Sequence, residues 1–296
     1  MTQKERFLVM DINDFKTRNQ IAETIEVEID DYCEKSADRW RSRRLGSSAI
    51  GKPCSRQIWY GFRWVKEDEF GSENRPAGQV FRLFNRGHRE EPVVVGLLQA
   101  IGCKLLSTDE SQETYSDCHD HAVTKLDGVI HLPEKFGVTE KVLLEIKTAS
   151  DTNFNKMQKK KVITAEPKYW DQMCFSAELG DFNYALFVVV NKNTDDIHVE
   201  FLKLDREHGR MLKDKAMAII TADVAPPKIS NSSTNFDCKF CNFKDICHFE
   251  GKAEKNCRSC IHAGTATEGN WFCKLHGNVI PTDFIPLGCD HHEGVK

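Results

Sequence analysis

The feature of the sequence that most restricts its fold is a pair of charged residues inside an apolar run, VLLEIKTA at residues 142–149. The run has the length and the Val, Leu and Ile content of a buried β-strand. Side chains alternate between the two faces of a strand, so Glu145 and Lys147 share one face while Leu144 and Ile146 share the other. Burying a carboxylate and an ammonium costs free energy unless another group compensates their charge.

A second strand-like run, KLDGVI at residues 125–130, brings another carboxylate, Asp127. A divalent cation bound by Asp127 and Glu145 would compensate the buried charge, and hard oxygen ligands suit Mg²⁺ or Mn²⁺. Such an ion can polarise a phosphate and help to generate a hydroxide nucleophile, and Lys147 beside it can orient that water. The alternative is a plain Glu–Lys ion pair on a half-exposed strand edge, with no metal.

The expected order of elements indicates a mixed α/β core. Residues 1 to about 45 are predicted to be helical, and strands are expected around Asp127 and Glu145. The other expected elements are helices at 79–102, 168–180 and 205–223 and a hairpin at 184–204. The lysine-rich stretch 151–167 is predicted to be a loop, and 224–237, rich in Pro, Ser and Asn, to be a linker.

The composition describes an ordinary globular protein of 296 residues, long enough for one generous domain or a core domain with an appendage. The net charge of −4 gives no global sign of nucleic-acid binding, so a basic surface would have to be local. No stretch approaches the roughly 20 apolar residues that span a bilayer. We therefore expect a cytoplasmic protein without a membrane partner.

The cysteines are unevenly distributed, since seven of the twelve lie between Cys238 and Cys289. Disulfides are rare in a reducing cytosol, so clustered cysteines there indicate metal binding. The first set, CKFCNFKDIC, contains Cys238, Cys241 and Cys247. Three thiolates need a fourth ligand for a tetrahedral zinc ion or a cubane cluster, and Cys54 is the candidate.

The second cysteine set has the spacing C-x2-C-x12-C-x15-C, which is typical of a four-cysteine structural zinc site. Its members are Cys257, Cys260, Cys273 and Cys289, with His262, His276, His291 and His292 as alternative ligands. A closed metal site would stabilise a segment that has too few apolar residues to fold alone. The remaining thiols, Cys33, Cys103, Cys118 and Cys174, are scattered and are expected to be unliganded.

Asp127 followed by Glu145-Ile146-Lys147 on the next strand resembles the active site of the PD-(D/E)XK nuclease superfamily. The similar region covers roughly residues 50–205. The resemblance implies a restriction-endonuclease-like core, in which a mixed central sheet is flanked by helices. The motif here lacks the proline that often precedes the aspartate.

Two further motifs belong to the same resemblance. GHREEP, at residues 87–92 and expected to open a helix, resembles the upstream acidic motif of the superfamily. The alignment favours Glu91, with Glu90 and His88 as competitors. Gln172 in YWDQMCFSAELG resembles the glutamine motif of the RecB, lambda-exonuclease and YqaJ branches.

The first cysteine set resembles that of the iron–sulfur nucleases, namely AddB and the CRISPR-associated RecB-like proteins. There, one cysteine before the nuclease core joins three after it, and the context of Cys54, with Arg56 and Tyr60, is similar. The resemblance implies a structural [4Fe–4S] cluster. A zinc ion bound by the same thiolates is the alternative.

The implied activity is that of a Mg²⁺- or Mn²⁺-dependent deoxyribonuclease that hydrolyses phosphodiester bonds. Lys147 would position the attacking water, and Gln172 would support the site. Lysines of the 151–167 stretch would contact DNA phosphates, although a solvated loop explains them equally well. The implied metal ligands are Glu91, Asp127, Glu145 and the carbonyl of Ile146.

We expect an N-terminal helical segment at 1–45, a nuclease domain at 46–250 and a zinc-type module at 251–296. The expected partners are the ends of linear double- or single-stranded DNA, with an annealing protein or a helicase as a further candidate. An exonuclease of DNA recombination or repair, of the phage or CRISPR type, fits best, and a phage-encoded enzyme would act in the host cytoplasm. The alternatives are a DNA endonuclease and a non-catalytic DNA-binding or assembly protein with a nuclease-like core.

Overall fold

The computed structural model describes residues 15–37, 41–66, 77–106 and 113–296. The chain forms two compact units, Met1–Trp40 with Glu69–His88, and Arg41–Asp68 with Arg89–Lys296. The smaller unit contains helix α1 (Phe15–Lys35) and the first half of α4 (Ala77–Ala100). Within it, Arg82 forms an ion pair with Asp30. The remaining elements belong to the larger unit.

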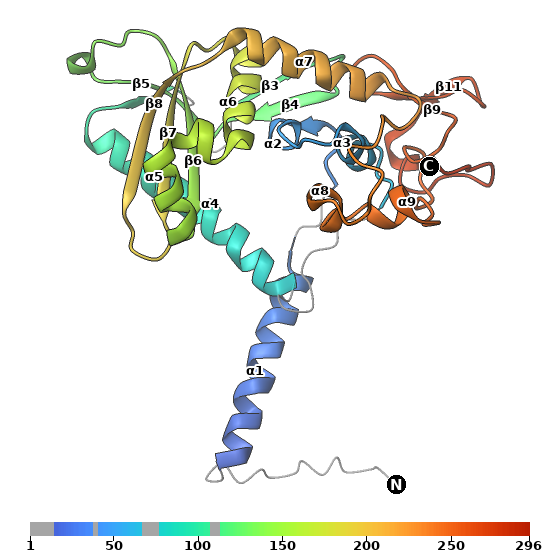
Figure 1. Ribbon diagram of the computed structural model, residues 1–296, viewed down its shortest axis with the longest axis horizontal. Coiled ribbons are helices and arrows are strands. Elements are labelled where there is room, and N and C mark those ends of the chain that lie inside the picture. The colour runs from blue at the N-terminus through green and yellow to red at the C-terminus, as the bar shows by residue number, and fades with distance from the viewer. Residues whose placement is uncertain (1–14, 38–40, 67–76, 107–112) are drawn as a thin grey trace. The chain divides into compact units, whose positions relative to one another are not determined.

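A five-stranded sheet forms the centre of the larger unit, with the order β2-β5-β6-β7-β8. Figure 1 labels β5, β6, β7 and β8 of this sheet. Strands β6 and β7 are parallel, whereas the other neighbouring pairs are antiparallel. The strands are β2 (Lys104–Leu105), β5 (Gly128–His131), β6 (Val142–Ala149), β7 (Tyr184–Asn191) and β8 (Ile197–Lys203). The sheet is therefore mixed, as the α/β prediction requires.

One face of the sheet is covered by the two helices that connect β6 with β7, α5 (Asp151–Ala165) and α6 (Pro167–Gly180). Parallel neighbours need such a crossover, because a tight turn cannot join them. Phe154 of α5 and Phe175 of α6 pack in one buried cluster with Leu143 and Phe187 of the sheet. Helix α7 (Arg206–Thr221) packs on α6 and is capped at its N-terminus by Asp205, whose carboxylate accepts two backbone N–H groups.

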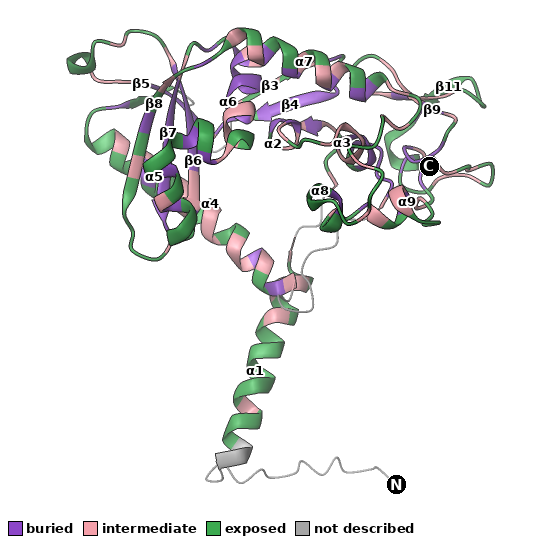
Figure 2. Ribbon diagram, in the orientation of Figure 1, coloured by how far each residue is buried: buried purple, intermediate pink, exposed green. Residues whose placement is uncertain are grey.

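The opposite face of the sheet carries a separate apolar cluster. Val94 of α4 packs there with Leu144 and Ile146 of β6 and with Val188 of β7. The two inner strands, β6 and β7, are buried over most of their length (Figure 2). The predicted alternation along β6 is confirmed, because Leu143 joins the first cluster while Leu144 and Ile146 join the second.

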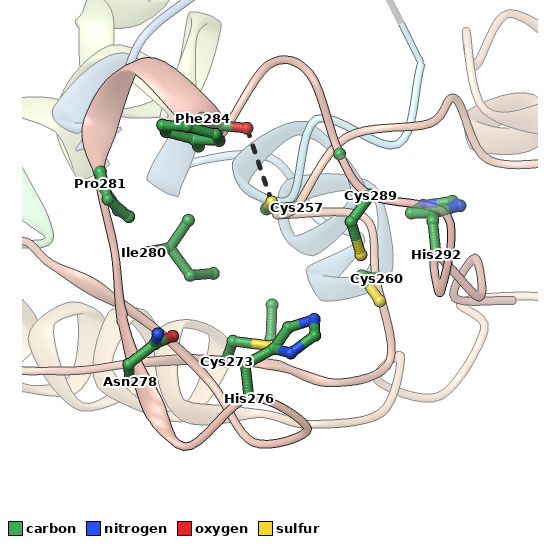
Figure 3. Close-up of a pocket in the computed structure, with 12 residues that line it drawn as sticks. Cys257, Cys260, Cys273, His276, Asn278, Ile280, Pro281, Phe284, Cys289 and His292 are labelled. Carbon is green, nitrogen blue, oxygen red and sulfur yellow. Dashed lines mark hydrogen bonds between the residues drawn. The ribbon is translucent and has the colours of Figure 1, made fainter.

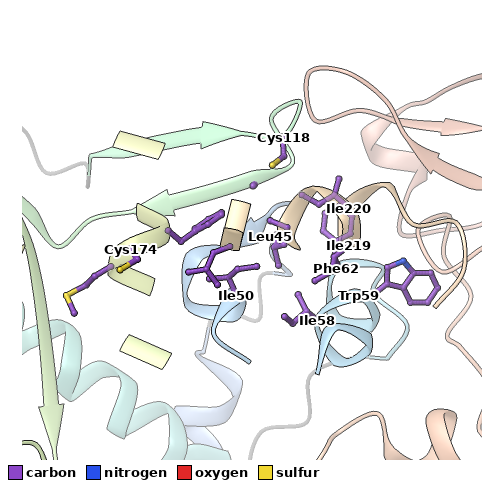
Figure 4. Packing of buried hydrophobic residues seen from close by; sticks show 14 of the residues in the cluster. Leu45, Ile50, Ile58, Trp59, Phe62, Cys118, Cys174, Ile219 and Ile220 are labelled. Atoms are coloured by element: carbon purple, nitrogen blue, oxygen red, sulfur yellow. The ribbon is translucent and has the colours of Figure 1, made fainter. Parts of the chain in front are cut away.

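A smaller sheet, ordered β1-β4-β3, lies beside the first and was not predicted. Its strands are β1 (Leu45–Gly46), β3 (Thr114–Asp117) and β4 (Ala122–Lys125), and it is accompanied by α2 (Ser47–Ile50) and α3 (Ser55–Phe62). Figure 4 shows part of the buried cluster around it, to which Leu45, Ile50 and Trp59 belong together with Ile219 and Ile220 of α7. The small sheet thus joins the aromatic segment before residue 66 to the main core.

The C-terminal region consists of short elements. These are α8 (Phe236–Lys239), α9 (Lys244–His248), the antiparallel strands β9 (Ala263–Thr265), β10 (Trp271–Cys273) and β11 (Asn278–Ile280), and the 3₁₀ turn η2 (Thr282–Phe284). Trp271 and Ile280 are buried in the same cluster as Trp59. The division of the chain at residues 45 and 250 stays a prediction.

The expected loop at 151–167 is wrong, because these residues form α5 and the start of α6. Phe154 and Met157 bury one face of α5 against the sheet, which compensates for its many exposed lysines. The helix is interrupted at Lys161, whose φ is +65°. The backbone N–H of Val162 donates to the Glu200 carboxylate there, at 2.9 Å.

The other expected elements of the core are confirmed, including the β5–β6 pair, the β7–β8 hairpin and the helix after residue 205. No helix among the described residues is long and apolar enough to cross a membrane.

The contact between α6 and α7 gives a test of the fold. A Cβ atom at Gly209 would lie 2.5 Å from the carbonyl oxygen of Cys174, so Gly209→Ala should force the helices apart. We expect a loss of about 1–3 kcal/mol in the free energy of unfolding, measured by urea denaturation. The control is Gly96→Ala, where a Cβ meets nothing within 4 Å, and it should gain up to about 1 kcal/mol. Equal stability of both variants would contradict the packing described.

Candidate active site

Three charged side chains meet at β6. Glu145 is 1% exposed and forms an ion pair with Lys147 on the same face of the strand. The Lys147 ammonium also lies 3.9 Å from Oδ2 of Asp127. The structure therefore brings together the two carboxylates and the lysine that the sequence pattern singled out.

Asp127 lies immediately before β5 and is directed toward β6. Its Oδ2 accepts the backbone N–H of Ile146 at 2.7 Å. The following residue, Gly128, is opposite Leu144 in the antiparallel pair, and a Cβ there would approach the side chains of Leu105 and Leu144 to 3.1 and 3.3 Å. A small residue after Asp127 thus allows the close packing that holds its carboxylate against β6.

Gln172 lies on α6, which covers the face of the sheet that carries Glu145. Its Nε2 donates to Oε1 of Glu145 at 2.8 Å, and its side chain is largely buried. The hydroxyl of Ser176 donates to the Gln172 carbonyl, one turn along the helix. The ring of Tyr169 lies 5.6 Å from the Lys147 ammonium, a distance suited to a cation–π contact. Glu145 is therefore held from both sides, by an amide and an ammonium.

The electrostatics of the site are dominated by burial. Burial raises the pKa of Glu145 from its ordinary 4.5 to about 7, Lys147 opposes this, and the charges of Asp127 and Glu91 add to it. Burial alone would lower the pKa of Lys147, but the charges of Glu145 and Asp127 outweigh it and raise that pKa. The lysine stays charged at neutral pH, and the glutamate can exchange its proton near neutrality.

Glu91 lies in the interior of α4, so the expectation that GHREEP opens a helix is wrong. The helix begins at Ala77 and contains Pro92. The effect of Glu91 on the pKa of Glu145 places its charge in the electrostatic neighbourhood of the site. Glu90 is next to it and half-buried, whereas His88 belongs to the smaller unit. The preference for Glu91 as a ligand stays a prediction.

The donor set at β6 suits a hard divalent cation, because it consists of carboxylate and carbonyl oxygens. Lys147 is the cation that contacts Asp127 and Glu145 in this structure. Across the described residues, no group of three or more His, Cys, Asp or Glu side chains is already arranged to hold a metal ion.

The structure brings the first cysteine set together around a single pocket. Cys54, immediately before α3, lines it with Cys238 of α8, Cys241 between the two helices and Cys247 of α9. Burial raises the pKa of the Cys241 thiol, and the nearby thiols add to the effect. Arg56 and Tyr60 also line the pocket. Four thiols that are far apart in the sequence therefore share one pocket.

The second cysteine set also surrounds one cavity, of about 280 Å³ (Figure 3). Burial and the charges of the other three thiols raise the pKa of Cys257, whose Sγ lies 3.6 Å from the carbonyl of Phe284. His276 and His292 line the cavity as well. The lining cysteines are Cys257, Cys260, Cys273 and Cys289. All four predicted ligands therefore face a common space.

Two buried arginines, Arg63 and Arg258, were missed by the sequence analysis. Each is 1% exposed. Burial lowers the pKa of Arg63 to about 10 and also lowers that of Arg258. The position of Arg258 inside the CRSC motif was visible in the sequence, but nothing there indicated that its side chain is buried.

No protein-family model matches this sequence, and no curated protein matches it significantly. Among solved structures, an alkaline exonuclease from Laribacter hongkongensis is similar with a TM-score of 0.42 and 14% identity, over 60% of this chain and 87% of that chain. A phage-related exonuclease from Haemophilus somnus 129PT has a TM-score of 0.33 and 15% identity, over 58% and 78%. The protein SSO0001 has a TM-score of 0.40 and 14% identity, over 77% and 96%. The likeness is distant, so any function has to be argued from the site.

The raised pKa of Glu145 predicts a pH dependence of stability in protein freed of divalent cations. Between about pH 4.5 and 7 the folded state retains a proton that the unfolded state has released. The unfolded state then binds fewer protons, so the contribution of Glu145 to the free energy of unfolding falls as pH rises through this window. We expect urea denaturation to show this fall for the wild type and a smaller one for Glu145→Gln. Identical pH profiles for the two proteins would contradict the burial of an ionisable glutamate.

Proposed function

We propose that this protein is a Mg²⁺- or Mn²⁺-dependent deoxyribonuclease that hydrolyses phosphodiester bonds. The observation that supports it is the contact network in which Lys147 reaches both Asp127 and Glu145 while Gln172 donates to Glu145. Two carboxylates, a lysine and an amide on adjacent elements are the groups that metal-assisted phosphodiester hydrolysis needs. The same residues carry the resemblance to PD-(D/E)XK nucleases.

The carboxylates of Asp127, Glu145 and Glu91 and the carbonyl of Ile146 would hold the divalent ion. When bound, that ion would supply charge for the scissile phosphate and lower the pKa of a water molecule. Lys147 would orient the attacking water and offset negative charge that builds up on the phosphate. Gln172 would keep Glu145 in place through its 2.8 Å hydrogen bond.

The proposed substrate is the end of linear DNA, which would make the protein an exonuclease of recombination or repair, of the phage or CRISPR type. Lysines 159, 160 and 161 are exposed on α5, the helix that directly follows the active strand. Exposed lysines on this helix suit contacts with the phosphate backbone, which position DNA without reading its sequence. An annealing protein or helicase acting on the same ends is a further proposed partner.

The two cysteine sets are proposed to hold structural metals. The set of Cys54, Cys238, Cys241 and Cys247 would bind a [4Fe–4S] cluster and tie α3 to α8 and α9. The second set, in the 251–296 module, would bind zinc. In both cases the supporting observation is the convergence of four thiols on one pocket.

Cleavage of DNA by Lys147→Ala tests the proposed activity. We expect a loss of at least about 10²–10³-fold, because the variant lacks a charge that acts on the transition state. The measurement follows the release of label from 5′- or 3′-labelled linear DNA with Mg²⁺ or Mn²⁺, beside a covalently closed circle. The matched control is Lys160→Ala, an exposed lysine that is expected to lose only a small factor through weaker DNA binding.

Each other outcome of this experiment has a definite meaning. Full activity in Lys147→Ala would show that the site is wrongly assigned. Cleavage of the closed circle would favour an endonuclease. No cleavage of any DNA by the wild type would favour a DNA-binding or assembly protein with a nuclease-like core.

The iron–sulfur assignment is tested by Cys241→Ser in anaerobically purified protein. We expect the wild type to be brown with four irons per chain and the variant to lose most of this absorbance and iron. The control is Cys103→Ser, a thiol outside both sets, which should keep the wild-type iron content. A colourless wild type with zinc at the first set would instead establish the alternative metal.

A further inference from the structure

We propose that the site of Cys257, Cys260, Cys273 and Cys289 binds zinc as a tetrathiolate whose net negative charge compensates Arg63 and Arg258, so that zinc holds the C-terminal segment on the core. The inference rests on the zinc assignment proposed above and is independent of nuclease activity. Zinc would then do more than stabilise the local fold, because its site would also hold residues 256–296 on the core by electrostatic attraction.

Arg258 lies between two of the proposed ligands in the sequence, and its side chain is buried among aromatic rings of the core. Its guanidinium stands 4.6 Å from the ring centre of Phe62, 4.4 Å from Trp64 and 4.6 Å from Trp271. It donates to the backbone carbonyls of Arg43, at 3.0 Å, and Phe62. The CRSC turn thus presents thiols to the cavity and a cation to the aromatic residues before residue 66.

Arg63 makes the reciprocal contact from the core to the C-terminal segment. One of its terminal nitrogens donates to the carbonyl of Cys260 at 2.7 Å and to that of Ala263 at 2.9 Å. Its guanidinium also lies 5.0 Å from Trp59 and 5.4 Å from Trp271. The two arginines therefore cross-link the same two segments, and one of them bonds directly to a proposed ligand residue.

Neither guanidinium forms an ion pair with a carboxylate within the described part of the chain. The Nε atoms of both Arg63 and Arg258 are buried without a hydrogen-bond partner there. Asp223, which acts on Arg63 at longer range, is itself paired with Lys274 at 2.6 Å. Two like charges are thus buried near each other, and aromatic rings and carbonyls alone compensate them poorly.

A zinc tetrathiolate would supply the missing charge. Four thiols release four protons to solvent, and four thiolates with one Zn²⁺ carry a net charge of −2. This equals the charge of the two guanidinium groups with the opposite sign. A site with three cysteines and one neutral histidine would carry only −1, so the charge of the surroundings favours the fourth cysteine.

The four cysteines also line one cavity, although they come from three separate parts of the C-terminal region. Cys257 and Cys260 come from the CRSC turn, Cys273 from β10 and Cys289 from the chain after η2 (Figure 3). His292 lies at the same cavity, but its Nε2 is within 3.0 Å of the Ser259 hydroxyl. The cavity of about 280 Å³ leaves the side chains room to close around an ion.

Zinc binding and the packing of residues 256–296 on the core are then coupled, and the coupling must be reciprocal. The free energy by which zinc stabilises this packing equals the free energy by which the packed arginines stabilise bound zinc.

The test uses the full chain and measures zinc content, zinc affinity by chelator competition, and hydrogen exchange of peptides from residues 256–263. Cys289→Ser should lose one zinc per chain and exchange at least tenfold faster in this segment. Cys247→Ser and Cys103→Ser should keep that zinc.

The arginine variants test the charge itself. We expect Arg258→Met to bind zinc at least tenfold more weakly than the wild type, while Arg258→Lys, which keeps the charge, stays closer to it. Zinc affinity within twofold of the wild type in a folded Arg258→Met protein would overturn the proposal. Should this variant fail to fold, the wild type still decides the question.

In the wild type, removal of zinc should speed exchange of residues 256–263 at least tenfold, and unchanged exchange would overturn the proposal. Iron in place of zinc at this site, or no metal, would overturn it as well. Lys147→Ala should leave every one of these measurements unchanged. Loss of the proposed nuclease function and failure of the zinc anchor are therefore distinguishable.

Discussion

The compensation of buried charge is the constraint on which the larger unit depends. Strand β6 is central in the sheet and buried on both faces, yet it carries Glu145 and Lys147. Their ion pair, the Gln172 amide and the approach of Asp127 together make this burial tolerable. Three features of the fold bring these groups to one point. They are the position of β6 between β5 and β7, the crossover through α5 and α6, and the placement of Asp127 before β5.

The C-terminal region is subject to the same constraint, but the buried charge there is positive. There, Arg63 and Arg258 are buried among aromatic rings and carbonyls, with no carboxylate paired to them in the described structure. At β6 two acids share one lysine, whereas in the C-terminal region two cations are buried together and one of them donates to the carbonyl of Cys260. A divalent cation at β6 and a zinc tetrathiolate at the second cysteine set would each restore the balance of charge. The same physical requirement therefore applies to the proposed active site and to the proposed structural zinc site.

Much of the candidate site could be predicted from the chain, because alternation along a strand is a local property. The shared face of Glu145 and Lys147, the β5–β6 pairing and the helix that carries Gln172 all follow from residue patterns or motifs. The helical state of α5 could not be predicted, since its sequence is lysine-rich and its stability comes from Phe154 and Met157 packing on the sheet. The burial of Arg63 and Arg258 could not be predicted from the sequence either.

By itself the sequence determined the periodicity of β6, the spacing of the two cysteine sets and the kinds of donor atom available, because these depend on neighbouring residues. Only the tertiary structure decided which groups compensate which charges. Arg63 bonds to the carbonyl of Cys260 across 197 residues of chain, and Gln172 reaches Glu145 from a different element. Electrostatic compensation falls with distance in space and takes no account of distance along the chain, so it is settled only when the segments pack.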